Sequence, residues 1–425
     1  MRFALFAAIA VALAGTSAQA ATETVLHSFC RLQQCGDGDS PQASLVGDAD
    51  GNLYGTSQGG ARDGGIVFRL HPKAGGKWSY DVIYDFDNGY HPEGSPLILD
   101  TEGRLYGTAS FGFTGGVVFR LTPHGRHWVF DSLHVFCATD CRDGATPVGG
   151  LSYAGLSTGA AYDGTAPLYG VAAEGGAFFG GVVFSLAPDN NDNWPLATLY
   201  AFCAHNHSKC LDGRQPSARP AIDVGGNLYG TASFGGPRGN GLIYKLSPGT
   251  GRRWTLTNLF DLCSGAGCTA GFNSLSGLVM DAEGFLYGTT LDGGAGGPSC
   301  SNGCGVLFKL STGGQLTSLH DFCSETLCAD GAAPANIGGL LIDASGNLFG
   351  TAIGGGAGQN SGGVVFEYSG GTYAKVYDFC VDGNCTDGKG PRGGLIQDSS
   401  GAFFGTTMLG GNRRANKGTV FEVEP

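Results

Sequence analysis

The stretch "DADGNLYGTSQGG", Asp48 to Gly60, recurs with small changes along this chain of 425 residues. Close copies are "DTEGRLYGTASFG", "DVGGNLYGTASFGG", "DAEGFLYGTTLDGG" and "DASGNLFGTAIGGG". Aligned on the glycine of Gly-Thr or Gly-Val, seven copies follow one another at intervals of 52 to 63 residues. Their glycines are Gly55, Gly107, Gly170, Gly230, Gly288, Gly350 and Gly405. A period of this size indicates an array of supersecondary units.

Every copy contains the same succession of short apolar runs. A first run such as "ASLVGDADG" turns into "NLYGT", and after a glycine-rich loop a third run such as "GIVFRL" follows. A fourth run ends in an aromatic residue, as in "YDVIYDF". In the third run, Ile66, Phe68 and Leu70 alternate with Val67 and Arg69. Alternation of β-branched and aromatic residues with period two predicts strands and not helices.

Four strands in each of seven units predict an all-β fold, a seven-bladed β-propeller that occupies residues 21–425. A β-solenoid is the alternative, but its period is usually shorter and its ends need caps. The last copy supplies strands at about 393–399, 402–407 and 418–424 and lacks a fourth. The segment "TETVLHSFC" near the N-terminus has the form of a fourth strand alone. We therefore expect residues 23–29 to pair beside 418–424 and to close the ring.

The first twenty residues have the pattern of a secretory signal peptide. Arg2 precedes 13 apolar residues, Phe3 to Gly15, and Ala18-Gln19-Ala20 fits a cleavage site between small residues. A membrane anchor is the alternative, but the apolar stretch is too short to span a bilayer. We expect cleavage after Ala20 and a secreted or periplasmic protein without a membrane span.

The composition narrows the classes of partner. Glycine is abundant, with 78 residues, and the hydrophobic fraction of 42% is compatible with a packed core. The formal net charge is −12 and becomes about −13 once Arg2 is removed. Because phosphate binding needs a Lys/Arg surface and no basic stripe occurs, nucleic acid is not expected as a partner. We expect a monomer that binds no cofactor.

The 14 cysteines fall into seven close pairs, which predict local disulfides in an exported protein. The pairs are Cys30 with Cys35, Cys137 with Cys141, Cys203 with Cys210, Cys263 with Cys268, Cys300 with Cys304, Cys323 with Cys328 and Cys380 with Cys385. One copy, "YDFDNGYHPEGSP", lacks both cysteines together, as bonded partners should. Zinc is the rival interpretation, but a pair without a consistent third ligand cannot close a tetrahedral site. We therefore expect no metal.

The repeat, with its pattern DxxGNLYGTTxxGGxxGxGVVFKL, resembles the GloVer repeat of exported bacterial proteins, named from Gloeobacter and Verrucomicrobia. The resemblance extends over nearly all of the predicted mature chain. It implies an extracellular or surface-associated repeat protein and no particular activity. Many relatives carry a C-terminal anchor, whereas this chain stops at its last predicted strand, so attachment by that route is not expected.

Candidate site residues lie where the copies differ, on the propeller face that collects the longer loops. One variable register just after the second strand holds Phe111, Glu174, Phe234, Asp292 and Leu409. Aromatic rings there could stack on a sugar, and the two acids could serve acid/base chemistry. The alternative for the two rings is that they pack between neighbouring blades.

Other polar residues are weaker candidates. His91 and Glu93 lie in the loop without cysteines, and His205 and His207 lie inside the sequence "CAHNHSKC". Each of these could be a base or a metal ligand, or part of an ordinary polar loop. "GGNRRANKG" is a local basic cluster that could meet a carboxylated glycan.

Two repeated acidic patterns are interpreted as turns. Five cysteine loops share the pattern C-x-D-G-x-x-P, and an Asp before Gly commonly accepts a backbone N–H. These aspartates are Asp37, Asp143, Asp212, Asp330 and Asp387, and a ring of ligand carboxylates is the alternative. "DADGN" is similar to the start of a calcium loop, but the other copies lack its second acid and the Glu needed later.

Two classes of function remain. The first is a non-catalytic exported propeller that binds a glycan or a protein through its loop face. Its partner would be an extracellular polysaccharide or another protein. The second, which rests on fold analogy, is a carbohydrate-active enzyme, either a polysaccharide lyase or a glycoside hydrolase. Titratable groups that converge at the channel mouth would favour the enzyme.

Overall fold

The computed structural model describes residues 21–92, 94–112, 115–264, 266–294, 300, 302–357, 361–381, 383–412 and 414–425. The predicted signal peptide, residues 1–20, lies outside these ranges and stays a prediction. In the described ranges, no helix has the length and apolar composition needed to cross a bilayer.

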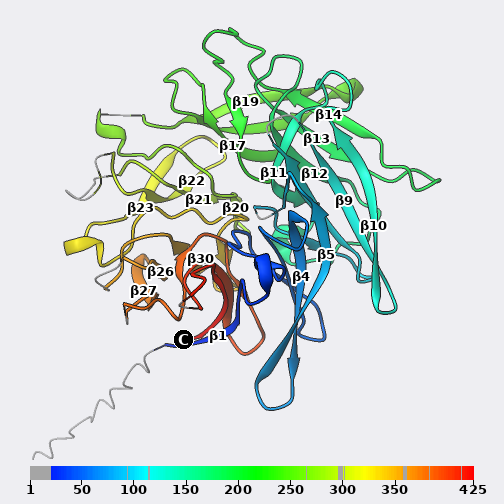
Figure 1. The fold of residues 1–425 in the computed structure, drawn as a ribbon. Helices are drawn as coiled ribbons and strands as arrows, with labels where there is room; N and C mark the ends of the chain where they lie inside the picture. Colours follow the sequence, from blue (N-terminus) through cyan, green and yellow to red (C-terminus); the bar gives the residue numbers. More distant parts are fainter. Residues whose placement is uncertain are drawn as a thin grey trace, which may run out of the picture.

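Seven antiparallel sheets follow one another along the chain, each a blade of a β-propeller, as predicted (Figure 1). Blade one contains β2 (Val46–Gly47), β3 (Leu53–Ser57), β4 (Asp63–Lys73) and β5 (Lys77–Asp87). Blade two contains β6 (Tyr90–His91), β7 (Ile98–Leu99), β8 (Leu105–Phe111), β9 (Gly115–His124) and β10 (His127–Phe136). Blade three contains β11 (Ala145–Ser152), β12 (Leu168–Glu174), β13 (Val182–Leu186) and β14 (Leu196–Ala201).

The later blades repeat this order. Blade four contains β15 (Arg214–Pro216), β16 (Ala221–Ile222), β17 (Leu228–Phe234), β18 (Leu242–Pro248) and β19 (Trp254–Asp261). Blade five contains β20 (Val279–Met280), β21 (Leu286–Thr290), β22 (Val306–Leu310) and β23 (Leu316–Asp321). Blade six contains β24 (Leu341–Ile342), β25 (Leu348–Ala352), β26 (Val364–Ser369) and β27 (Thr372–Asp378). The described helical segments are short 3-10 turns: η1 (Gln33–Cys35), η2 (Leu156–Thr158), η3 (Thr250–Arg252), η4 (Ala266–Cys268) and η5 (Thr326–Cys328).

Blade seven joins the two ends of the chain. It contains β28 (Lys389–Pro391), β29 (Ile396–Gln397), β30 (Phe403–Leu409), β31 (Thr419–Glu424) and, as its outer strand, β1 (Thr22–Ser28). The two terminal strands pair antiparallel from Thr22 opposite Glu424 to Ser28 opposite Thr419. Figure 1 shows the C-terminus beside β1. The predicted closure of the ring by the N-terminal strand is confirmed.

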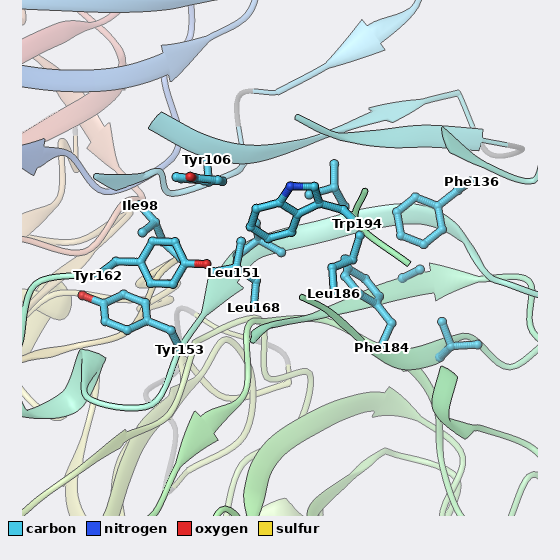
Figure 2. Close-up of a cluster of buried hydrophobic side chains, with 13 residues drawn as sticks. Ile98, Tyr106, Phe136, Leu151, Tyr153, Tyr162, Leu168, Phe184, Leu186 and Trp194 are labelled. Atoms are coloured by element: carbon cyan, nitrogen blue, oxygen red, sulfur yellow. The ribbon is translucent and has the colours of Figure 1, made fainter. Parts of the chain in front are cut away.

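The core consists of seven apolar clusters, each between two consecutive blades. Ile66, Phe68 and Leu70 of β4 face the cluster shared with blade seven, whereas Val67 faces the cluster shared with blade two. The predicted period-two alternation is therefore the way in which one strand serves both of its neighbours. Figure 2 shows the cluster between blades two and three, where Trp194 and five other aromatic side chains fill the space.

The repeated glycine of the second strand lies beneath an aromatic ring of the third strand. A Cβ atom on Gly55 would lie 2.5 Å from Phe68 Cζ and 2.8 Å from Leu45 Cδ2. Equivalent rings lie over the other six glycines, and in blade four the ring is that of Tyr244. None of the seven glycines has a positive φ. Close packing, and not an unusual backbone conformation, therefore explains why this position holds glycine.

The "DADGN" segment is a hairpin turn, as interpreted from the sequence. The Asp48 carboxylate accepts hydrogen bonds from the backbone N–H groups of Asp50 and Asn52 at 3.0 and 2.9 Å. It also accepts bonds from the Asn52 amide and the Tyr54 hydroxyl at 2.7 and 2.9 Å. Asp223 makes the same set of four bonds in blade four. The carboxylate ties the turn to the second strand.

Candidate functional site

The axis of the propeller contains two cavities, one towards each face. The cavity on the loop face, about 220 Å³ in volume, is lined mainly by Gly, Ser, Pro and aliphatic residues, with His91 and Gln42. Arg392 lies close to this mouth, and its Nη1 donates to Gln42 Oε1 at 2.8 Å. The second cavity, on the side of the hairpin turns, is lined by the inner strands of all seven blades.

The two aromatic candidates lie on the loop face, each beside a partner from its own blade. Phe111 pairs with Tyr90 across β8 and β6, and the two ring centroids lie 5.0 Å apart. Phe234 pairs with Arg214 across β17 and β15, with the guanidinium 5.6 Å from the ring centroid. Both phenylalanines are 44% exposed, so neither ring is enclosed between blades.

The two acidic candidates occupy the same register but belong to different blades. Glu174, in blade three, accepts a hydrogen bond from Gln215 Nε2 at 2.6 Å. Asp292, in blade five, accepts one from Asn273 Nδ2 at 3.0 Å. Blade four lies between them, and each carboxylate accepts from an amide of another segment, Gln215 of β15 in blade four and Asn273 of the loop before β20. The structure thus places them as separate groups.

The remaining predicted candidates belong to polar loops and to the basic cluster. His91 is exposed and lines the mouth cavity, whereas Glu93 lies outside the described residues. His207 lies near Phe178, with the two ring centroids 5.1 Å apart and the planes tilted by 37°. In the basic cluster, Lys417 is paired with Asp39 at 3.1 Å, and residue 413 lies outside the described residues.

All seven predicted disulfides are present, and each joins two cysteines four to seven residues apart. The bonds are Cys30–Cys35, Cys137–Cys141, Cys203–Cys210, Cys263–Cys268, Cys300–Cys304, Cys323–Cys328 and Cys380–Cys385. Six of them lie in loops that lead from one blade to the next. For example, the bond between Cys137 and Cys141 follows β10 of blade two, and the bond between Cys380 and Cys385 follows β27 of blade six. The local pairing inferred from the sequence is confirmed.

The seventh disulfide, Cys300–Cys304, lies between β21 and β22 of blade five. There it meets Cys323–Cys328, and the four sulfur atoms lie within 4.8 Å of one another. The argument from the sequence treated each cysteine pair by itself, whereas folding brings these two pairs together. Both pairs are nevertheless disulfides and leave no thiolate for a metal.

The aspartates of the cysteine loops hold those loops in shape. Asp330 accepts hydrogen bonds from the backbone N–H groups of Ser324 and Glu325, and His320 Nε2 lies 3.0 Å from it. Burial alone would raise the pKa of the Asp330 carboxyl, but the hydrogen bonds outweigh it and hold the pKa below its usual value. Asp37, Asp143, Asp212 and Asp387 accept backbone bonds in the same way. These contacts agree with the structural interpretation of the pattern.

A cationic groove lies on the loop face of blade four, between the Cys203–Cys210 loop and the loop after β17. We call it the blade-four groove. Its volume is about 400 Å³, and its charged lining residues are Lys209, Arg214 and Arg238, all exposed. Among the described residues, none of the three forms an ion pair. His207 also lines the groove, and the Phe234 ring lies beside Arg214.

Sequence reasoning found Phe234 but missed the cations around it. Lys209 and Arg214 are close in sequence, but Arg238 follows a strand and two turns later. They meet because Arg214 pairs directly with Phe234, which places the two loops side by side. The sequence offered only part of the signal, because the blade-seven copy also holds cations around this register, among them Lys389 and Lys417, but places Leu409 where blade four places the Phe234 ring.

Comparisons with known proteins bear on the family and the fold. The model of the family described as Gloeobacter/Verrucomicrobia repeat matches residues 13–167, 157–300 and 266–425. No curated protein matches the chain.

Among solved structures, a putative 6-phosphogluconolactonase of Bacteroides uniformis is 14% identical, with 85% of this chain and 87% of that chain covered and a TM-score of 0.45. An ulvan lyase of family PL25 is 11% identical, with 80% and 85% covered and a TM-score of 0.45. The soluble aldose sugar dehydrogenase of Escherichia coli is 14% identical, with 95% and 99% covered and a TM-score of 0.42. At these values the likenesses carry no argument about function.

Proposed function

This chain belongs to the Gloeobacter/Verrucomicrobia repeat family. From this membership and from the blade-four groove, we propose that the protein is an exported, non-catalytic propeller. It binds an acidic glycan through its loop face. The observation that carries the proposal is the group of three exposed cations beside an aromatic ring, none of which forms an ion pair with another described residue. Carboxylated and sulfated polysaccharides are the chemical class that such a groove would take.

Charge supports an anionic ligand. The chain as a whole has a formal net charge of −12, so a local group of Lys209, Arg214 and Arg238 stands out against its surroundings. An arginine side chain presents a planar fork of N–H groups that matches the two oxygens of a carboxylate or sulfate. A mainly polar, open groove suits a chain of sugars better than a compact apolar molecule.

The aromatic ring and the rigid loop support a sugar. The Phe234 ring is 44% exposed and is flanked by the Arg214 guanidinium, so part of its face can contact the apolar face of a sugar ring. The Cys203–Cys210 disulfide closes the adjoining loop. Asp212 holds the same loop by accepting the N–H groups of Ala204 and His205. A site fixed in advance loses little conformational freedom on binding.

The placement of the acids weighs against the enzyme alternative. Paired carboxylates of a glycosidase lie on the order of 5–10 Å apart and face a common substrate. Glu174 and Asp292 instead belong to blades three and five, and each is bound by its own amide partner. Within the described residues, His91 is the one titratable side chain that lines the mouth cavity.

Export is the remaining part of the proposal. Seven disulfides are typical of a protein that folds in an oxidising compartment. Together with the predicted signal peptide, they favour a periplasmic or extracellular location.

Affinity electrophoresis of the mature protein tests the proposal. We expect retardation in gels with polygalacturonate or a sulfated polysaccharide, little retardation in dextran, and weakening by salt. Arg214→Gln should weaken binding roughly tenfold or more, as expected for the loss of a charged hydrogen-bond pair. Phe234→Ala and Arg238→Gln should also weaken it.

Two matched variants serve as controls. Arg253→Gln removes an exposed arginine just before β19, and Phe111→Ala removes a ring of blade two whose residue is as exposed as Phe234. Both should bind as the parent does. Equal losses in the controls, or equal retardation in dextran, would contradict the proposal. New reducing ends or unsaturated products after incubation would instead support the enzyme.

A further inference from the structure

The cavity on the turn side of the axis has a volume of about 340 Å³ and an apolar wall. We call it the axial cavity. Residues such as Leu97, Ile222, Met280, Ile342 and Ile396 line it, each from a different blade. Ligand pockets are usually about 300–1,000 Å³ in volume, mostly apolar, with a few polar groups that orient the ligand. The axial cavity lies within that range.

Closely packed backbone divides the axial cavity from the loop face. A Cβ atom on Gly338 of blade six would lie 2.4 Å from Ser44 Oγ of blade one and 2.9 Å from Pro96 Cγ of blade two. The Ser44 hydroxyl donates to the Ile337 carbonyl at 2.9 Å. Blades that are not neighbours in the ring thus touch at this level. The axial cavity is therefore a separate site from the glycan groove.

Arg219 is the charged residue of the axial cavity. At the equivalent register the other blades place Ser44, Pro96 or a glycine, so this long cationic side chain is a departure from the repeat. Its Nη2 donates to the Gly338 carbonyl at 2.7 Å, across the axis from blade four to blade six. The guanidinium has five N–H donors, and four remain after this bond.

The charge of Arg219 has no carboxylate partner among the described residues, and the acidic side chains of the hairpin turns bond within their own turns. Desolvation lowers the pKa of Arg219 to about 10, and the nearby Tyr153 hydroxyl opposes this only in part. An uncompensated guanidinium in an apolar cavity is costly unless another group supplies acceptors.

A second departure from the repeat lies at the same cavity. Blade three carries a long connection between β11 and β12, and its residues Leu156, Ser157 and Gly159 line the cavity. Tyr153 and Tyr162 anchor the connection in the core between blades two and three (Figure 2). The Thr101 N–H donates to the Tyr162 carbonyl at 3.0 Å and fixes the connection to blade two. Ser157 and Gly159 are exposed, so the connection forms part of the cavity rim.

We propose that the axial cavity binds a small apolar carboxylate, with the carboxylate on the Arg219 guanidinium and the hydrocarbon body against the ring of aliphatic side chains. Charge complementarity selects the anion, because the described residues that line the cavity include the Arg219 cation and no acidic side chain. The aliphatic wall selects the hydrocarbon, since its burial removes apolar surface from water on both sides. The blade-three connection and Arg219, the two features that the repeat does not require, each serve one part of this recognition.

Isothermal titration calorimetry with octanoate, octanol and octylammonium tests the proposal on the full mature protein. We expect one octanoate per chain, weaker binding of octanol and no saturable binding of octylammonium. Arg219→Met should reduce octanoate affinity roughly tenfold or more, because a charge-assisted pair is lost, and should leave octanol binding nearly unchanged. Arg253→Met, which removes an exposed arginine of blade four, should bind octanoate as the parent does.

A second variant keeps the test decisive if Arg219→Met does not fold. Ser157→Trp places a large ring at the exposed rim and should abolish binding of octanoate and octanol alike. Thr317→Trp, on the exposed outer strand β23, is the matched control and should change neither. Equal affinities for the three probes, no binding of octanoate, or octanoate binding that survives Ser157→Trp would each overturn the proposal. Glycan binding should be unaffected by all four variants.

Discussion

At the scale of single residues, the repeated glycine shows how one atom is excluded by packing. In blade two, a Cβ atom on Gly107 would lie 2.6 Å from Phe119 Cζ and 2.8 Å from Leu97 Cδ2. Phe119 is fully buried and cannot move aside without disturbing the core between blades one and two. The sequence predicts that this position is special, and the structure identifies the ring above it as the reason.

We expect Gly107→Ala to lower the free energy of unfolding by about 1–3 kcal/mol, the usual cost of overpacking a core by one methyl group. Urea denaturation followed by tryptophan fluorescence measures the change. Gly313→Ala is the control, because its added Cβ would meet only Ser311 Oγ at 3.7 Å. That variant should stay within about 0.5 kcal/mol of the parent. If the two variants are equally stable, packing does not explain the glycine.

At the scale of elements, the six loops between blades that hold a disulfide share one construction. A short disulfide closes the loop, and an aspartate just after it accepts the backbone N–H groups. The aspartate also meets a His or Tyr from the preceding strand, as His134 meets Asp143 at 2.8 Å and Tyr200 meets Asp212 at 2.7 Å. In the loop between blades four and five, Ala270 stands in place of the aspartate. Phe260 of the preceding strand stands in place of the His or Tyr, so both polar partners are replaced together.

The four-sulfur cluster of blade five makes the pairing of its cysteines the most informative test at this scale. We expect peptide mapping by mass spectrometry, after alkylation without reductant, to give seven local disulfides and no alkylated cysteine. Elemental analysis of the same sample should show no stoichiometric zinc. Links between Cys300 or Cys304 and Cys323 or Cys328, or free thiols with bound zinc, would contradict the local pairing.

At the scale of the whole molecule, the stability of the ring depends on the seam where the two ends meet. Glu23 of β1 lies at this seam, near Asp387 of the loop between blades six and seven. Burial, and secondarily the charge of Asp387, raises the pKa of Glu23 from 4.5 to about 8. The folded protein therefore holds a proton on Glu23 that the unfolded chain releases above pH 4.5.

Because the pKa of Glu23 is raised in the folded state, the protonated carboxyl contributes to the stability of the fold. This contribution to the free energy of unfolding is fully present below pH 4.5 and is lost as the pH rises towards about 8. We expect Glu23→Gln to match the parent at pH 5 and to exceed its stability at pH 9 by roughly 1–2 kcal/mol, less than full linkage because the carboxyl is partly exposed. Urea denaturation at both pH values measures this. Glu424→Gln, an exposed carboxylate on the paired strand β31, is the control. A Glu23→Gln difference that does not change with pH would contradict the burial of the carboxyl at the seam.

The sequence by itself determined the architecture and the local pairings of this protein. The spacing of "LYGT" fixed seven blades, the alternation in "GIVFRL" fixed the strands, and the isolated "TETVLHSFC" indicated how the ring closes. Each of these depends on contacts between neighbours in the sequence or between successive copies, which a repeat makes visible. Cysteines four to seven residues apart, such as Cys137 with Cys141 and Cys203 with Cys210, belong to the same class.

Only the tertiary structure decided where the candidate sites lie. Arg214 meets Phe234 and Arg238 because two loops of blade four are held side by side, and Arg219 meets Gly338 because the closed ring brings blades four and six to one axis. Glu174 and Asp292 share a register but are kept apart by the blade between them. These contacts between distant residues depend on the curvature and closure of the ring. The packing of all seven inter-blade cores sets that geometry, and no single copy of the repeat contains it.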